Sequence, residues 1–187
     1  MALLLTAAAC GGGKPTTGTE GTVQPLANQV LSLEQLYTLE AAGVPPGDTS
    51  VTFPAGTARH VILRHGPPDN TVFAELIFPA GVFGGITHPD SVRVSVKPRP
   101  GIYGVEFACN LPLGPGARLV FKYPVHFSAP VGAQQKYGTP VAFERALSIA
   151  RLLPDGRYLL LLSTRPAADN LEAPLAGSGT YLVAAPR

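Results

Sequence analysis

Tryptophan is absent from this chain of 187 residues, cysteine occurs only twice, and charged residues make up only 14% of the sequence. Sugar-binding surfaces stack exposed aromatic rings on their ligand, so a chain without tryptophan and with only 6 tyrosines is a poor candidate for carbohydrate binding. The formal net charge is +2 and the basic residues are scattered, which argues against the basic patch of a nucleic-acid-binding protein. We expect no nucleic-acid partner.

Long apolar runs and enzyme motifs are missing too. After residue 10, no apolar stretch approaches the roughly 20 residues that an α-helix needs to cross a bilayer. The sequence contains no Gly-x-Ser-x-Gly nucleophile motif, no Walker loop and no dinucleotide-binding fingerprint. We therefore expect a protein that is not an enzyme and that uses no cofactor.

Apolar residues, glycine and proline are what the sequence has in quantity. The hydrophobic fraction of 45% argues against disorder, which goes with low hydrophobicity and high charge. The 21 glycines and 20 prolines interrupt the chain too often for long helices. Together with the length, these features predict a single domain of short elements, over residues 30–187, behind an N-terminal tail.

From about residue 50, apolar residues recur with the period of two that is typical of β-strands. Asp155 and Gly156 lie between two apolar runs, and Asp-Gly in that position is a strong signal for a β-hairpin. No helical stretch separates the strands, so we predict an all-β fold, an antiparallel β-sandwich. The strands are predicted at residues 71–78, 91–97, 101–107, 118–123, 145–153, 157–163 and 179–184.

One short helix is predicted ahead of the strands, over residues 32–42. Ser32 and Gln35 have the spacing of a capping box at a helix N-terminus, and Gly43 suits the C-terminal cap. The apolar residues between these caps fall on one helical face, which favours packing of the helix on the domain behind it.

The first ten residues carry a signal of their own. Residues 1–9 are uncharged and end in three small alanines directly before Cys10. This arrangement resembles the lipobox of bacterial lipoproteins, in which the cysteine carries the lipid and becomes the mature N-terminus. The resemblance implies a short or truncated signal segment at 1–9, lipidation of Cys10, and a membrane anchor in the bacterial cell envelope, at the outer membrane or the cell surface. Residues 10–29, rich in glycine, threonine and proline, are then a flexible tether.

A second resemblance covers residues 50–125. The motif Phe-Pro-Ala-Gly ends a predicted strand at 78–81, a segment at 104–107 follows after further strands, and a strand at 118–123 runs into a proline. This succession resembles the ZU5-like β-sandwich repeats of bacterial surface lipoproteins. It implies an Ig-like or ZU5-like sandwich that acts as a structural or binding module, with a protein partner in the envelope. Residues 140–187 either complete the same sandwich or form an extension.

The tripeptide His126, Phe127 and Ser128 supports an alternative. In some ZU5-containing and related proteins such a site cleaves itself, which here implies attack of the Ser128 hydroxyl on the Phe127 carbonyl while His126 assists proton transfer. A packed Phe127 in a loop between prolines is the plainer interpretation. A further alternative is an exported carbohydrate-binding or hydrolytic domain whose site is built from loops.

We predict no metal site. His60 and His65 are five residues apart, so they point to opposite faces of a strand. His88 and Asp90 add two ligands in a loop, and the Asp and Asn residues at 69, 70, 155, 169 and 170 lack the dense spacing of a calcium-binding loop. The second cysteine, Cys109, ends an apolar run and is interpreted as a small buried hydrophobe.

Overall fold

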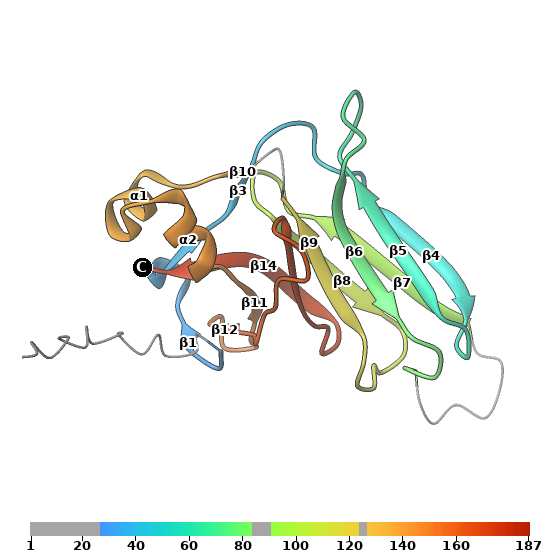
Figure 1. The fold of residues 1–187 in the computed structure, drawn as a ribbon. Coiled ribbons are helices and arrows are strands. Elements are labelled where there is room, and N and C mark those ends of the chain that lie inside the picture. Colours follow the sequence, from blue (N-terminus) through green and yellow to red (C-terminus); the bar gives the residue numbers. More distant parts are fainter. Residues whose placement is uncertain (1–26, 84–90, 124–126) are drawn as a thin grey trace, which may run out of the picture.

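The computed structural model of the chain describes residues 27–83, 91–123 and 127–187 (Figure 1). The predicted signal segment and residues 10–26 of the predicted tether lie outside this part. Strands make up most of the described elements, with one 3₁₀ turn and two short helices between them. In chain order the elements are β1 (Val30–Leu31), η1 (Leu33–Gln35), β2 (Leu36–Thr38), β3 (Glu40–Ala41), β4 (Thr49–Pro54), β5 (Arg59–Arg64), β6 (Val72–Phe78), β7 (Ser91–Pro98), β8 (Gly104–Cys109), β9 (Arg118–Lys122), β10 (Phe127–Ser128), α1 (Val131–Tyr137), α2 (Pro140–Ala146), β11 (Ser148–Leu152), β12 (Tyr158–Leu160), β13 (Asn170–Pro174) and β14 (Gly179–Pro186).

Two antiparallel sheets pack together, so the predicted mainly-β architecture is confirmed. The larger sheet has the strand order β1-β12-β11-β14-β8-β7-β4, with β2 joined to β14, and the smaller has the order β13-β9-β6-β5. The strands from 50–125 supply three neighbours to each sheet, and the strands after residue 147 extend both. Residues 140–187 therefore complete the same pair of sheets.

The core lies between the sheets and contains a line of aromatic rings. In β7, Val92, Val94 and Val96 are fully buried, in agreement with the predicted alternation. Phe73 on β6 stacks on Tyr103, which precedes β8, with ring centroids 5.0 Å apart. Such aromatic contacts join the smaller sheet to the larger one.

The predicted hairpin is present. Strands β11 and β12 pair in antiparallel register on either side of the Asp155–Gly156 turn, where Gly156 adopts a positive φ of 83°. The Asp155 carboxylate accepts a hydrogen bond from the main-chain N of Arg157 (3.0 Å) and thereby fixes the turn. The strand before the turn begins at Ser148 rather than at residue 145, because α2 occupies the preceding residues.

The predicted helix over residues 32–42 is wrong. The main-chain N of Ser32 donates to Gln35 Oε1 (2.9 Å), as in a capping box, but only the single turn η1 follows. The chain then becomes extended because backbone partners from distant strands are available; for example, Leu39 N donates to Val183 O (2.8 Å). These tertiary hydrogen bonds outweigh the local helical preference.

The two helices between residues 131 and 146 were not predicted. Helix α2 begins with a common N-cap arrangement. Thr139 Oγ1 accepts a hydrogen bond from Ala142 N (3.1 Å), and Pro140 occupies the first turn. At its other end, the Arg165 guanidinium donates to the main-chain oxygen of Glu144. A cation at this position complements the carbonyl end of the helix.

Residues 36–45, which we call the strap, connect the two sheets. The strap begins as β2 on the larger sheet, and Leu39 O accepts a hydrogen bond from Tyr103 N (2.9 Å). At its far end, Val44 O accepts from Gly66 N (3.0 Å), directly after β5 of the smaller sheet. The Leu39 side chain is fully buried in the main core. The strap therefore closes one end of the sandwich with both its backbone and an apolar side chain.

We predict that Leu39→Ala lowers the free energy of unfolding by roughly 2–5 kcal/mol, because the change leaves a cavity beneath the strap. Leu162→Ala is the matched control, since Leu162 is 66% exposed, and its effect is expected within about 0.5 kcal/mol. Chemical denaturation followed by circular dichroism measures both. Equal effects of the two changes would show that the strap does not contribute to the core.

Candidate functional site

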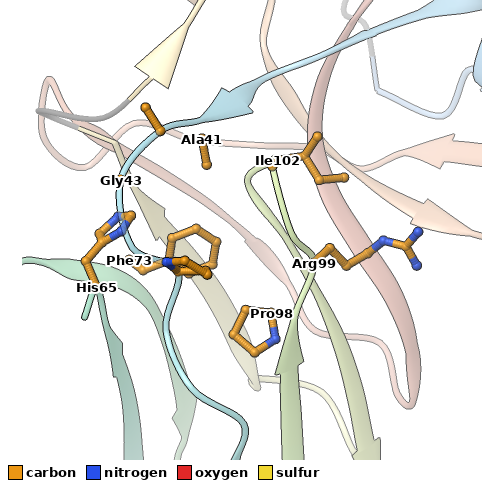
Figure 2. Close-up of a pocket in the computed structure, with 10 residues that line it drawn as sticks. Ala41, Gly43, His65, Phe73, Pro98, Arg99 and Ile102 are labelled. Carbon is orange, nitrogen blue, oxygen red and sulfur yellow. The ribbon is translucent and has the colours of Figure 1, made fainter. Parts of the chain in front are cut away.

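A small cavity lies behind the strap and is drawn in Figure 2. Its volume is about 30 Å³, which is room for a single water molecule. The strap, the end of the smaller sheet and the connection between β7 and β8 form its walls. The residues that line it are Ala41, Ala42, Gly43, Pro45, His65, Phe73, Pro98, Arg99, Gly101 and Ile102.

His65 is the polar side chain deepest in this wall. It is only 3% exposed, and its Nδ1 lies 3.2 Å from Val44 O. Its ring meets Phe73 edge-on at a centroid distance of 5.3 Å and lies 6.3 Å from Tyr103. This surrounding of aromatic rings and a strap carbonyl makes His65 a structural link between β5 and the strap, since a cavity of this size admits no substrate.

Tyr103 forms the other side of the same aromatic cluster. Burial raises the pKa of Tyr103 to about 12, because the ionised phenolate would lose its hydration. Burial also raises the pKa values of Tyr123, Tyr137 and Tyr181. These four phenols therefore favour the protonated form because they are buried, and their raised pKa values do not by themselves indicate a catalytic role.

A larger depression, which we call the groove, lies on the opposite side of Arg99 and Ile102. Its volume is about 250 Å³, just below the usual range of small-molecule pockets. Leu36 and Leu182 form a floor that is almost fully buried, whereas Leu33 at the rim is 48% exposed. Figure 2 shows the Arg99 side chain directed away from His65, on the far side of the β7–β8 connection. The residues that line the groove are Leu33, Leu36, Thr38, Arg99, Ile102, Tyr158, Leu182 and Arg187.

The two arginines of the groove differ in how they are held. The main-chain N of Arg187 donates to Gln35 O (2.7 Å), and its Nε donates to Leu36 O (3.0 Å). The same guanidinium lies 4.9 Å from the centroid of the Tyr37 ring, a cation–π contact. Arg99 is exposed, and its guanidinium has no hydrogen bond or ion pair with the described residues. The groove therefore combines an apolar floor with one fixed and one adaptable cation.

The predicted site residues are either outside the described part of the chain or described by their backbone alone. Cys10 and His126 lie outside the described residues, as do the side chains of Phe127 and Ser128. The backbone of the last two forms β10, in which Ser128 is paired with Glu40 of β3. Lipidation of Cys10 and cleavage at Ser128 therefore stay predictions.

The potential metal ligands named from the sequence lie in different parts of the chain, and not all of them belong to the described residues. His60 of β5 is exposed, whereas His65, the residue after β5, is buried, so the two rings lie in different environments. His88 and Asp90 lie outside the described residues, and within residues 27–83, 91–123 and 127–187 no three His, Cys, Asp or Glu side chains gather. Asp155 instead accepts from Arg157 Nε (2.9 Å), and this hydrogen bond holds the Asp155 pKa below its usual value.

Cys109 is only half-buried rather than fully enclosed, and it has no disulfide. Burial nevertheless raises the pKa of its thiol, which disfavours the nucleophilic thiolate. Its main-chain N donates to Ser178 Oγ (3.0 Å), so this residue fixes the turn before β14 to the end of β8. The interpretation of Cys109 as a small buried hydrophobe is therefore only partly met, because the side chain is half-buried.

Comparison of the chain with protein-family models, with curated proteins and with solved structures finds no significant match. The ZU5-like resemblance of residues 50–125 is therefore still a prediction. Among the helices of the described part of the chain, none has the length and apolar character needed to cross a membrane.

The buried phenols predict a loss of stability at high pH. The folded-state pKa of Tyr103, about 12, lies above the value of about 10 in an unfolded chain, so the folded protein holds this proton more tightly. The resulting stabilisation, roughly 2–3 kcal/mol, is fully present below pH 10 and is lost progressively as the pH rises from about 10 to about 12. Tyrosinate absorbance, undisturbed by tryptophan, and circular dichroism follow ionisation and unfolding in one titration.

Tyr103→Phe is the control for this titration because it keeps the ring and removes the ionisable group. We expect the variant to retain more of its stability above pH 10 than the parent protein. If all tyrosines titrated near pH 10 while the circular dichroism stayed unchanged, the raised pKa of Tyr103 and its link to stability would be contradicted.

Proposed function

We propose that this protein is a lipid-anchored component of the bacterial cell envelope whose Ig-like or ZU5-like β-sandwich acts as a non-enzymatic structural or binding module. The anchor is Cys10, the tether is the polar segment after it, and the envelope location is the outer membrane or the cell surface. The partner of the module is a protein of the envelope.

The observation that carries this proposal is the run of small residues before Cys10 in the sequence, and the position of the chain ends agrees with it. Strand β1 lies near the start of the described chain, at the same end of the molecule as the C-terminus, α1 and α2 (Figure 1). Strands β4, β5 and β7 extend to the other end. If the domain is attached through its N-terminal tether, the end formed by β4, β5 and β7 points away from the anchor. Cys10 to Leu26 comprise 17 residues, for which a flexible chain has a root-mean-square end-to-end distance of roughly 20–25 Å.

The strand arrangement supports the sandwich part of the proposal. The segment with the ZU5-like resemblance forms β4 to β9, which places three strands in each sheet and encloses much of the aromatic core. Structural and adhesive modules use such rigid sandwiches to hold loops in place. The fold alone does not specify an activity, and the proposed role rests on the anchor as well.

The intact mass of the chain, expressed from Met1 in a bacterium that processes lipoproteins, tests the anchor. We expect a protein that begins at Cys10 and is heavier by its acyl groups, because the lipobox places the modified thiol at the mature N-terminus. Cys10→Ser is the matched control and should abolish both processing and acylation. An unmodified chain that still begins at Met1 would refute the anchor, and two fragments that meet between Phe127 and Ser128 would favour self-cleavage instead.

A further inference from the structure

The groove is the open part of a second, smaller core on the larger sheet. Leu182 alternates along β14 with Tyr181 and Val183 of the main core, so it points to the opposite face of the sheet. On that face it belongs to a separate buried cluster together with Leu36, and Leu31 of β1 packs against this cluster. An additional apolar side chain in the groove would complete the burial of this small core and stabilise it.

The charges around the groove are balanced. Arg99 and Arg187 line it, and Glu34 interacts with Arg187. Glu40 is exposed and bridged to Ile102, and Arg187 also carries the α-carboxylate at the end of the chain. Two guanidinium groups and three carboxylates nearly cancel, so the rim gives no reason to expect a charged occupant. The apolar floor therefore determines what fits.

The described chain begins in a turn close to this second core. Ala27 and Asn28 lie in the turn, and Asn28 has a positive φ of 69°. A positive φ is typical of asparagine at the third position of a β-turn, and such a turn reverses the direction of the chain. The residues after the turn are fixed, because Asn28 N donates to Leu160 O (2.8 Å) and Val30 pairs with Leu159 of β12.

We infer that residues 21–26 return along β1 and that the side chain of Val23 docks in the groove. With Leu26 and Gln29 as the outer residues of the turn, antiparallel alignment brings Val23 level with Ser32, directly before the rim. The returning segment contains no charged side chain, which agrees with the balanced charges around the groove.

The free edge of β1 supports the same arrangement. Strand β1 is the last strand of the larger sheet, and within the described part of the chain only β12 pairs with it. Its outward backbone groups are therefore available to a returning segment. Pro25 is compatible with this position, since a strand at the edge of a sheet tolerates a residue that has no N–H group.

Docking of residues 21–26 shortens the free part of the proposed tether. The remaining 11 residues, from Cys10 to Glu20, have a root-mean-square end-to-end distance of roughly 17–20 Å as a flexible chain. The domain is then held nearer to the bilayer. This consequence rests on the proposed lipid anchor, whereas the docking itself does not depend on it.

Nuclear magnetic resonance of the full chain carrying Cys10→Ser tests the docking without any attached lipid. We expect the heteronuclear NOE values of the amides between residues 21 and 26 to be close to those of β1, because both are ordered on the fast timescale. We also expect NOE contacts from the Val23 methyl groups to Leu33 and Leu182. Amides as mobile as those of residues 11–18 would overturn the inference, as would the absence of any contact between Val23 and the groove.

Val23→Ser removes the docked side chain and should lower the ratio of docked to free segment roughly tenfold, because the burial of one valine is lost. The methyl resonances of Leu33 and Leu182 report this ratio, with a chain that has only glycine and serine at 21–25 as the free reference. Val131→Ser is the matched control, since Val131 is 72% exposed on α1, and should leave these resonances unchanged. Equal shifts for the two variants, or no shift for Val23→Ser, would overturn the inference.

Dilution separates docking within one chain from docking of Val23 on a second copy. We expect the ratio of docked to free segment to be independent of protein concentration, because the segment is attached beside its site. A ratio that falls on dilution would overturn the intramolecular arrangement in favour of exchange between copies. The anchor is tested by the mass of the wild-type chain and the docking by resonance of the Cys10→Ser chain, so failure of one is distinguishable from failure of the other.

Discussion

Strands β8 and β14 of the larger sheet part from each other at Tyr103 and Val183, and the backbone of Leu39 fills the gap between them. Leu39 N donates to Val183 O (2.8 Å), and Leu39 O accepts from Tyr103 N (2.9 Å), while Val183 N still donates to Tyr103 O (2.8 Å). Three segments that are far apart in the sequence thereby satisfy one another's backbone groups in the interior, where an unpaired group would be costly. The strap owes its extended shape to this junction.

Both ends of the strap depend on the same junction. In one direction the strap reaches Val44, whose carbonyl oxygen accepts from Gly66 N and faces His65, so the smaller sheet is joined to the larger. In the other direction it leads back to Leu36 and η1, which place Leu33 at the rim of the groove. The closure of the core and the shape of the groove are therefore two results of one constraint.

The elements predicted correctly from the sequence are those whose signals are local. The valine alternation of β7 and the Asp155–Gly156 hairpin need no information from the rest of the chain. The capping box at Ser32 is also a local signal and does form. Its hydrogen bonds need only the single 3₁₀ turn η1, so the motif does not require a longer helix. What extends the chain beyond Gln35 is pairing with β14, about 150 residues later in the sequence, and no periodicity within residues 32–42 indicates it.

The groove was beyond sequence reasoning for a similar reason. Leu33, Arg99 and Arg187 lie far apart in the sequence, and none belongs to a motif, so only the sheet topology brings them to one place. The helices at 131–146 carried recognisable signals, with Thr139 and Pro140 at the start of α2. The expectation that no helix separates the strands overlooks those signals. The lipid anchor, in contrast, is inferred from sequence alone.

Native-state hydrogen exchange of individual amides tests most directly whether the junction at Leu39 holds the domain together. If it does, the amides of Leu39 and Tyr103 exchange only through global unfolding, with the same free energy as the amide of Val94 in the centre of the larger sheet. Exchange of the Leu39 amide through a local opening, while Val94 stays fully protected, would show that the strap detaches from an intact sandwich. That result would contradict the dependence of the two sheets on the Leu39 junction.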